Sequence, residues 1–216
     1  MADQLFLSFW LRNYSDATML RNYEKLLKLF PFSRLARQAS TFRVMAVDPN
    51  EPVVAEVPYP PPVPVDAVVA IAKDFQNPDS SYRLETWWDL WQVDPEQPGG
   101  DWKVAPAKVA LCCFGPDFDQ TPSAGLSTRR TSVIASPGED SAIGCALEIE
   151  FGIDAHFLPQ PDAPESTRMI ESNIKSLLKL VHDLDDALPV DTRRLWSESG
   201  ENFAEKLQHA LSAVAE

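Results

Sequence analysis

Glycine and histidine are scarce in this chain, and their scarcity excludes several kinds of site. The 216 residues include 8 glycines against 19 prolines, so many loops are stiff and few backbone positions can approach a phosphate closely. This composition argues against a nucleotide-binding loop. The three histidines occur without H-x-x-x-H or C-x-x-C spacing, which leaves little scope for zinc. We therefore expect no metal and no cofactor.

Cysteine is also scarce, and its pattern bears on the compartment. Cys112, Cys113 and Cys145 are odd in number and two are adjacent, which excludes a disulfide framework. Adjacent residues of a strand point to opposite faces, so at most two of these thiols can meet. We interpret all three as buried structural thiols. The apolar run from Leu5 to Leu11 is too short to span a bilayer, and no basic lead precedes it. These features predict a reduced, cytoplasmic protein.

Basic residues are fewer than acidic ones, and this imbalance restricts the classes of binding partner. The net charge is -13, of which residues 1–50 contribute +3 and residues 51–216 contribute -16. Because most of this surface would repel a polyanion, nucleic acid and anionic membranes are excluded as expected partners. A basic patch in the first fifty residues could meet an acidic partner or a second copy of the chain, although a solvated mixed surface is the favoured interpretation. Its members would be Arg12, Arg21, Lys25, Lys28, Arg34, Arg37 and Arg43.

Hydrophobic periodicity, by contrast, is abundant and predicts an α+β fold. A first helix is expected to begin at Ser15 or Asp16 and to end at Pro31. A last helix is expected from about Ser199. The other predicted elements are strands over residues 4–11, 39–48, 53–58, 82–93, 104–115 and 143–153, and helices over residues 65–76 and 165–187.

These elements predict one domain over residues 1–216, with an antiparallel-dominated sheet of about six strands. Up to residue 94 their order is β-α-β-β-α-β, which is typical of a ferredoxin-like unit with the sheet order 4-1-3-2. Residues 95–158 add strands and a long loop, which has a possible short strand near residues 130–135. Residues 159–216 are predicted to be a helical C-terminal part with two helices.

The segment 82–93 is the most informative stretch of the sequence. As a strand it places Trp87 and Trp91 on one face, among the charged residues Arg83, Glu85 and Asp89. Burying a tryptophan side chain contributes a few kcal/mol, so exposing both would be costly. We therefore expect the helix over 165–187 to cover this face. In the alternative, at least one of the two tryptophans lines a ligand surface.

Catalytic motifs are few. An apolar run followed by Asp117, Asp119 and Thr121 resembles the nucleophile loop of haloacid-dehalogenase-type phosphotransferases. However, Gly115-Pro116 separates the run from Asp117, and the alternating parallel β/α pattern of that family is missing. We interpret the segment as an acidic turn. The chain also has no G-x-S-x-G elbow, so no catalytic residues are assigned.

Paired carboxylates offer the alternative of an enzyme. If the strand over 104–115 lies between its neighbours, Glu85 and Asp89 share a sheet face with Glu148 and Glu150. The backbones would then lie about 9–10 Å apart, at roughly 4.8 Å per strand. Glycosidases use acid pairs at comparable spacing. These four residues could therefore serve an acid/base hydrolase, with a sugar stacked on a tryptophan.

Surplus aromatic residues and the lack of catalytic motifs favour a different role. We expect a non-catalytic cytoplasmic binding or protein-interaction domain, with an unknown protein partner or a second copy of the chain bound to it. The expected contact surface includes Trp87, Trp91 and Trp102. It also includes the polar loop over 116–140 near Arg129 and Arg130.

Overall fold

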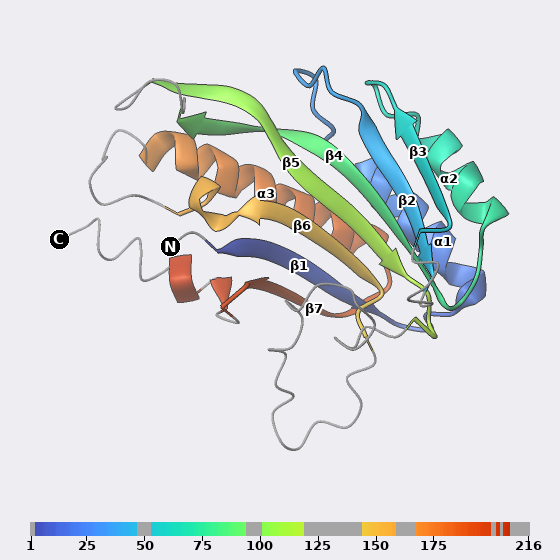
Figure 1. The fold of residues 1–216 in the computed structure, drawn as a ribbon. Helices are drawn as coiled ribbons and strands as arrows, with labels where there is room; N and C mark the ends of the chain where they lie inside the picture. Colours follow the sequence, from blue (N-terminus) through green and yellow to red (C-terminus); the bar gives the residue numbers. More distant parts are fainter. Residues whose placement is uncertain are drawn as a thin grey trace.

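Seven strands from all parts of the chain form one antiparallel sheet. The computed structural model describes residues 3–46, 53–93, 101–118, 144–158, 167–199, 202–203 and 205–207. Within them the strand order is β3-β2-β4-β5-β6-β1-β7 (Figure 1). The strands are β1 (Gln4–Leu11), β2 (Ser40–Ala46), β3 (Ala55–Tyr59), β4 (Ser80–Val93), β5 (Trp102–Phe114), β6 (Leu147–Ile153) and β7 (Val190–Ser197). The helices are α1 (Asp16–Leu29), α2 (Val65–Asp74), the 3-10 turn η3 (Asp154–His156) and α3 (Thr167–Ala187).

The six predicted strands and the first three predicted helices are confirmed, with ends that shift by a few residues. Helix α1 begins after Ser15, whose backbone N–H donates to the Thr18 side-chain oxygen at 3.0 Å, while the Thr18 N–H donates to the Ser15 carbonyl at 2.9 Å. These bonds satisfy groups that a helix start leaves unpaired. The helix ends before Pro31 as expected, because proline has no backbone N–H to continue it.

The structure does not confirm the ferredoxin-like unit, although the order of elements up to β4 is as predicted. In the order 4-1-3-2, β1 would lie between β3 and β4. Instead β1 pairs with β6 and β7, and β4 lies between β2 and β5. The long hairpin of β4 and β5 explains the difference, since β5 follows β4 directly in the chain and occupies the side that β1 would need.

The C-terminal part is not purely helical as predicted, because it also contributes the edge strand β7. This strand reads Val-Asp-Thr-Arg-Arg-Leu-Trp-Ser, and its charged centre hides the alternation that would identify a strand. It pairs with β1 from Leu5↔Ser197 to Leu11↔Val190. Of the predicted last helix, Phe203 and residues 205–207 are helical.

Helices α1, α2 and α3 lie on one face of the sheet (Figure 1). The prediction that α3 covers the opposite face is therefore wrong: Leu177, Leu180 and Leu184 of α3 join the same core as α1 and α2. The width of the sheet gives the reason. Seven strands at about 4.8 Å span roughly 29 Å, and helices pack about 8–10 Å apart, so three helices are needed to cover one face.

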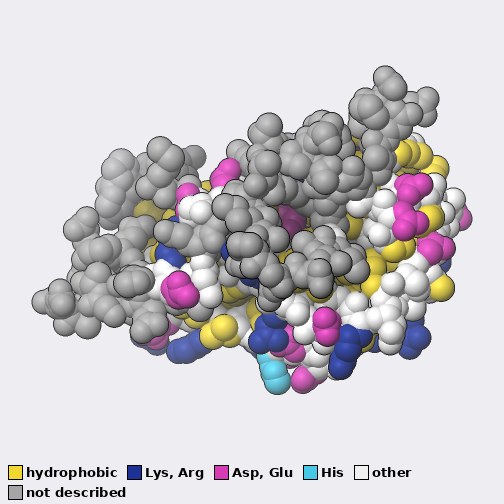
Figure 2. Space-filling view, turned by 90° about the horizontal axis from the view of Figure 1, so that it is seen from below, with side chains coloured by type: hydrophobic (Ala, Val, Ile, Leu, Met, Phe, Trp, Pro, Cys, Tyr) yellow, Lys and Arg dark blue, Asp and Glu magenta, His cyan; other side chains and the backbone are white. Residues whose placement is uncertain are grey.

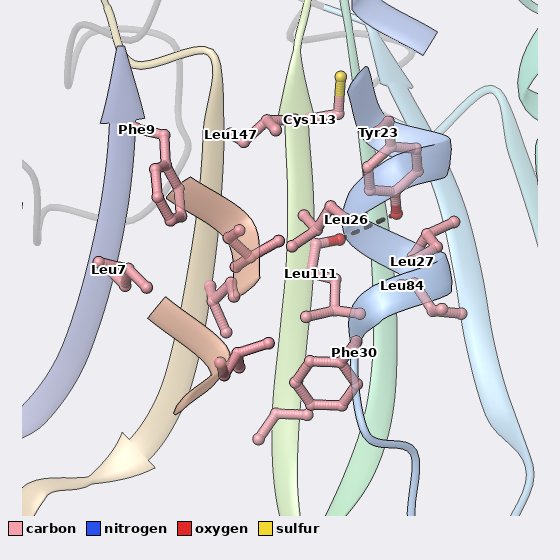
Figure 3. Close-up of a cluster of buried hydrophobic side chains, with 14 of the residues drawn as sticks. Leu7, Phe9, Tyr23, Leu26, Leu27, Phe30, Leu84, Leu111, Cys113 and Leu147 are labelled. Atoms are coloured by element: carbon pink, nitrogen blue, oxygen red, sulfur yellow. Dashed lines mark hydrogen bonds between the residues drawn. The ribbon is translucent and has the colours of Figure 1, made fainter. Parts of the chain in front are cut away.

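The core between helices and sheet is closed by aromatic and aliphatic side chains (Figure 3). Tyr23 of α1 is fully buried and its hydroxyl donates to the Leu111 carbonyl of β5 at 3.0 Å. Trp88 of β4 is 3% exposed and lies against Phe30, Phe151 and Phe157. Adjacent side chains of β4 therefore lie on opposite faces of the sheet: Trp88 is in this core and Trp87 points away from it.

This alternation predicts a large difference between two adjacent tryptophans. Trp88→Ala should lower the free energy of unfolding by about 3–5 kcal/mol, since it leaves a cavity in the core. Trp87→Ala, the matched control on the other face, should cost about 1 kcal/mol or less. Urea unfolding of both variants measures this. Equal losses would mean that β4 does not alternate as described.

Candidate functional site

The candidate site lies on the sheet face opposite the helices, which we call the open face. Cross-strand register fixes which side chains share it, because directly paired residues point to the same side. Glu85 pairs with Ala110, which pairs with Glu150. In the next row Arg83 pairs with Cys112, and Cys112 pairs with Glu148. The predicted placement of β5 between the two acidic strands is thus confirmed.

The side chain of Arg83 joins the two acidic strands across this face. Its guanidinium donates to both oxygens of Glu150, at 2.5 and 2.8 Å, and its Nε lies 3.4 Å from Glu85. Glu85 also forms ion pairs with Arg43 at 3.1 Å and with Lys108 at 2.9 Å. A bidentate pair of this kind is among the stronger charge-assisted contacts. The acids are therefore held by cations and do not face each other as a free pair.

The cations determine the titration of Glu85. Burial alone would raise its pKa, but the hydrogen bond from Lys108 and the charges of Lys108, Arg83 and Arg43 lower the pKa below the ordinary value of 4.5. A general acid at neutral pH needs the opposite shift. The geometry of Glu85 thus suits a structural ion pair better than proton donation.

Glu148 has a different environment, next to β1 and β7. It is 3% exposed and accepts a hydrogen bond from the Ser8 hydroxyl at 2.8 Å. The Trp196 ring nitrogen donates to the same hydroxyl at 3.0 Å, and the Cys145 thiol lies 3.8 Å from the carboxylate. Ser8 and Trp196 were not identified from the sequence, because their strands meet only in the fold.

The cysteines are divided between the two faces of the sheet, as their spacing predicts. Cys113 belongs to the main core, while Cys112 and Cys145 lie in a smaller apolar cluster on the open face with Phe114 and Phe118. All three thiols are buried. The interpretation as buried thiols is confirmed. Asp117 of the D-x-D motif lies in a turn, where its backbone N–H donates to the Pro78 carbonyl, and Asp119 lies outside the described residues.

Asp89 accepts hydrogen bonds from uncharged groups. The Ser33 hydroxyl donates to one carboxylate oxygen, and the Arg34 backbone N–H donates to the other at 2.9 Å. Ser33 in turn accepts the backbone N–H of Ala36 at 2.9 Å. The carboxylate therefore fixes the loop after α1 against β4. Sequence inspection missed this role because Ser33 and Asp89 are far apart in the chain.

The predicted contact tryptophans come together on one surface. Register pairs Trp91 with Val104 and Val93 with Trp102, so these side chains point to the same side as Trp87. Each tryptophan is partly exposed, and Val93 and Val104 are each 40% exposed. We call this surface the tryptophan face; it consists of Trp87, Trp91, Val93, Trp102, Val104 and Pro106. The predicted contact residues Arg129 and Arg130 lie outside the described residues.

Three of the basic side chains of the first fifty residues have polar partners in the fold. Lys28 pairs with Glu24 at 2.5 Å, Arg43 pairs with Glu56 at 2.5 Å, and Lys25 donates to the Ala187 carbonyl at 2.7 Å. Figure 2 shows basic side chains lying among acidic ones on the face seen there. These contacts favour the interpretation as a mixed surface.

Comparisons with protein-family models, curated proteins and solved structures found no match for this chain. Its function must be inferred from its own geometry. Among the described residues, no three His, Cys, Asp or Glu side chains converge to hold a metal ion. No helix in the same part of the chain is long and apolar enough to cross a membrane.

The lowered pKa of Glu85 predicts how its contribution to stability depends on pH. Because the folded pKa lies below the ordinary value, ionised Glu85 stabilises the fold above about pH 4.5, and this contribution disappears as the pH falls through the folded value. Glu85→Gln should therefore cost about 1–2 kcal/mol at pH 7 and less at pH 3. Urea unfolding at both pH values measures the difference.

Glu171→Gln is the control, because its pair with Lys175 spans 3.6 Å between exposed side chains. It should cost under about 0.5 kcal/mol at pH 7. A cost of Glu85→Gln that grows on acidification would contradict the ion-pair assignment.

Proposed function

We propose that this protein is a non-catalytic binding module that contacts a partner protein through the tryptophan face. The observation that supports this is the gathering of three partly exposed tryptophans and two exposed valines on the hairpin of β4 and β5. Tryptophan is enriched in the energetically dominant part of protein interfaces. Large apolar side chains that gather partly exposed on one surface often mark a site of protein–protein contact.

The architecture supports a rigid contact surface. Helices α1, α2 and α3 pack against the other side of the sheet, so the opposite face of the hairpin is packed in the core. Asn173 of α3 also bonds the backbone of Trp91, accepting its N–H and donating to its carbonyl, both at 2.9 Å. A preorganised surface loses little conformational entropy on binding. The tryptophan face is therefore suited to recognise a partner without rearrangement.

The alternative, an acid/base hydrolase acting on a sugar, receives less support. Its acids would be Glu85 and Glu150, which share one row of the open face. Arg83 contacts both carboxylates, and the lowered pKa of Glu85 opposes proton donation. Asp89 and Glu148, the other two of the four predicted acids, accept hydrogen bonds from Ser33 and Ser8.

Removal of two rings should weaken partner binding without unfolding the protein. The test compares proteins captured from the source cells by the wild type, by the double variant Trp87→Ala/Trp91→Ala, and by Leu178→Ala. Leu178 is 56% exposed on α3 and serves as the matched apolar control. A captured protein is then purified, and its Kd for each form is measured by calorimetry.

We expect wild type and Leu178→Ala to bind this protein equally. The double variant should bind at least tenfold more weakly, which corresponds to about 1.4 kcal/mol. If no captured protein distinguishes the double variant from Leu178→Ala, the proposed contact surface is wrong.

A further inference from the structure

A carboxylate lies between two rings of the tryptophan face. Alternate residues of a strand share a side, so Trp87, Asp89 and Trp91 form one row on β4. Neighbours in this row are about 6.8 Å apart along the strand, at roughly 3.4 Å per residue. A group placed over either ring is therefore next to the carboxylate.

The carboxylate of Asp89 is fixed in orientation and keeps its charge available. It is held by the Ser33 hydroxyl and by the Arg34 backbone N–H. Across the described part of the chain, no Lys or Arg side chain forms an ion pair with it, and Arg34 offers only its backbone. Each carboxylate oxygen has a second lone pair that can accept a further donor.

The neighbouring strand does not neutralise this row. Pro106 lies opposite Asp89 and Val104 lies opposite Trp91, and neither carries charge. Lys108 lies opposite Trp87, but its ammonium pairs with Glu85 at 2.9 Å. The row therefore combines two partly exposed aromatic rings with one carboxylate that pairs with no cation of the described residues.

We propose that the row Trp87–Asp89–Trp91 binds an arginine side chain in a basic segment of the partner protein, an inference that rests on the proposed function. A cation within about 6 Å of a tryptophan ring is attracted by the ring quadrupole. The planar guanidinium stacks on aromatic rings and donates two parallel hydrogen bonds to a carboxylate, which an ammonium cannot do. The net charge of -13 also draws basic partners toward this protein.

The probe that tests this is a nonapeptide of arginine, titrated into the full-length protein and followed by calorimetry. Asp89→Asn and the double variant Trp87→Ala/Trp91→Ala should each weaken binding by about fivefold or more. Trp91→Phe keeps an aromatic ring at this position, so it should weaken binding less than the double variant does. Because Asp89 also holds the loop after α1, urea unfolding verifies that each variant is folded.

Asp191→Asn is the charge-matched control, because Asp191 is exposed on β7 and its replacement removes the same charge elsewhere. It should change the affinity by less than about twofold. Equal weakening by Asp89→Asn and Asp191→Asn would show general attraction only and would overturn the proposal.

Two further arms test the chemistry of the ligand. A nonapeptide of lysine should bind more weakly than the arginine peptide, and equal affinity would overturn the arginine assignment. Equimolar tetramethylammonium should not displace the arginine peptide. Displacement would assign the row to a small quaternary cation instead of a protein segment.

Binding of the captured protein to the variants tests this proposal separately from the proposed function. If the captured protein needs Trp87 and Trp91 but binds Asp89→Asn as well as wild type, the binding module stands and the arginine assignment fails. If no captured protein depends on these rings, the proposed function fails, whatever the peptides do.

Discussion

The pairing of β4 with β5 is the constraint on which the rest of the structure depends. These two strands are paired from Ser81↔Phe114 to Val93↔Trp102, and they form the centre of the sheet. Their register decides at once which side chains enter the helix-covered core and which lie on the open face. A slip of one residue would move every side chain to the other side, placing Trp87 and Glu85 in the core and Trp88 outside it.

The open face combines two kinds of surface along the same strand. Toward the middle of the sheet, Arg83, Glu85 and Glu150 form ion pairs that are mutually satisfied. Toward the end of the hairpin, beyond the reach of β2 and β6, the side chains become tryptophan and valine. The charges there are fewer, and Asp89 is held by hydrogen bonds from neutral groups. Satisfied charges stabilise a fold, whereas the exposed rings form the proposed binding surface.

The sequence predicted local features and the neighbours of β5 well, and the positions of β1 and α3 poorly. Alternation along 82–93 and the helical spacing before Pro31 correspond to contacts within one element, and both were correct. The ferredoxin-like order failed because the neighbour of β1 depends on loops and strands far along the chain. The position of α3 failed for a similar reason, since it is set by the total width of a sheet whose seventh strand was not recognised. Ser33, which holds Asp89, and Arg83, which holds Glu150, were unpredictable as partners because only the folded sheet brings them together.

The register of the hairpin can be measured directly by nuclear Overhauser effects in solution. Because the N–H and carbonyl of Trp91 both bond to Asn173, Trp91 and Val104 form a pair without backbone hydrogen bonds between them, with Cα atoms about 4.5 Å apart. A strong effect between the α-protons of Trp91 and Val104 is expected, and likewise between Val93 and Trp102. Strong effects from Trp91 to Lys103 or Ala105 instead would show a shifted register and contradict the tryptophan face.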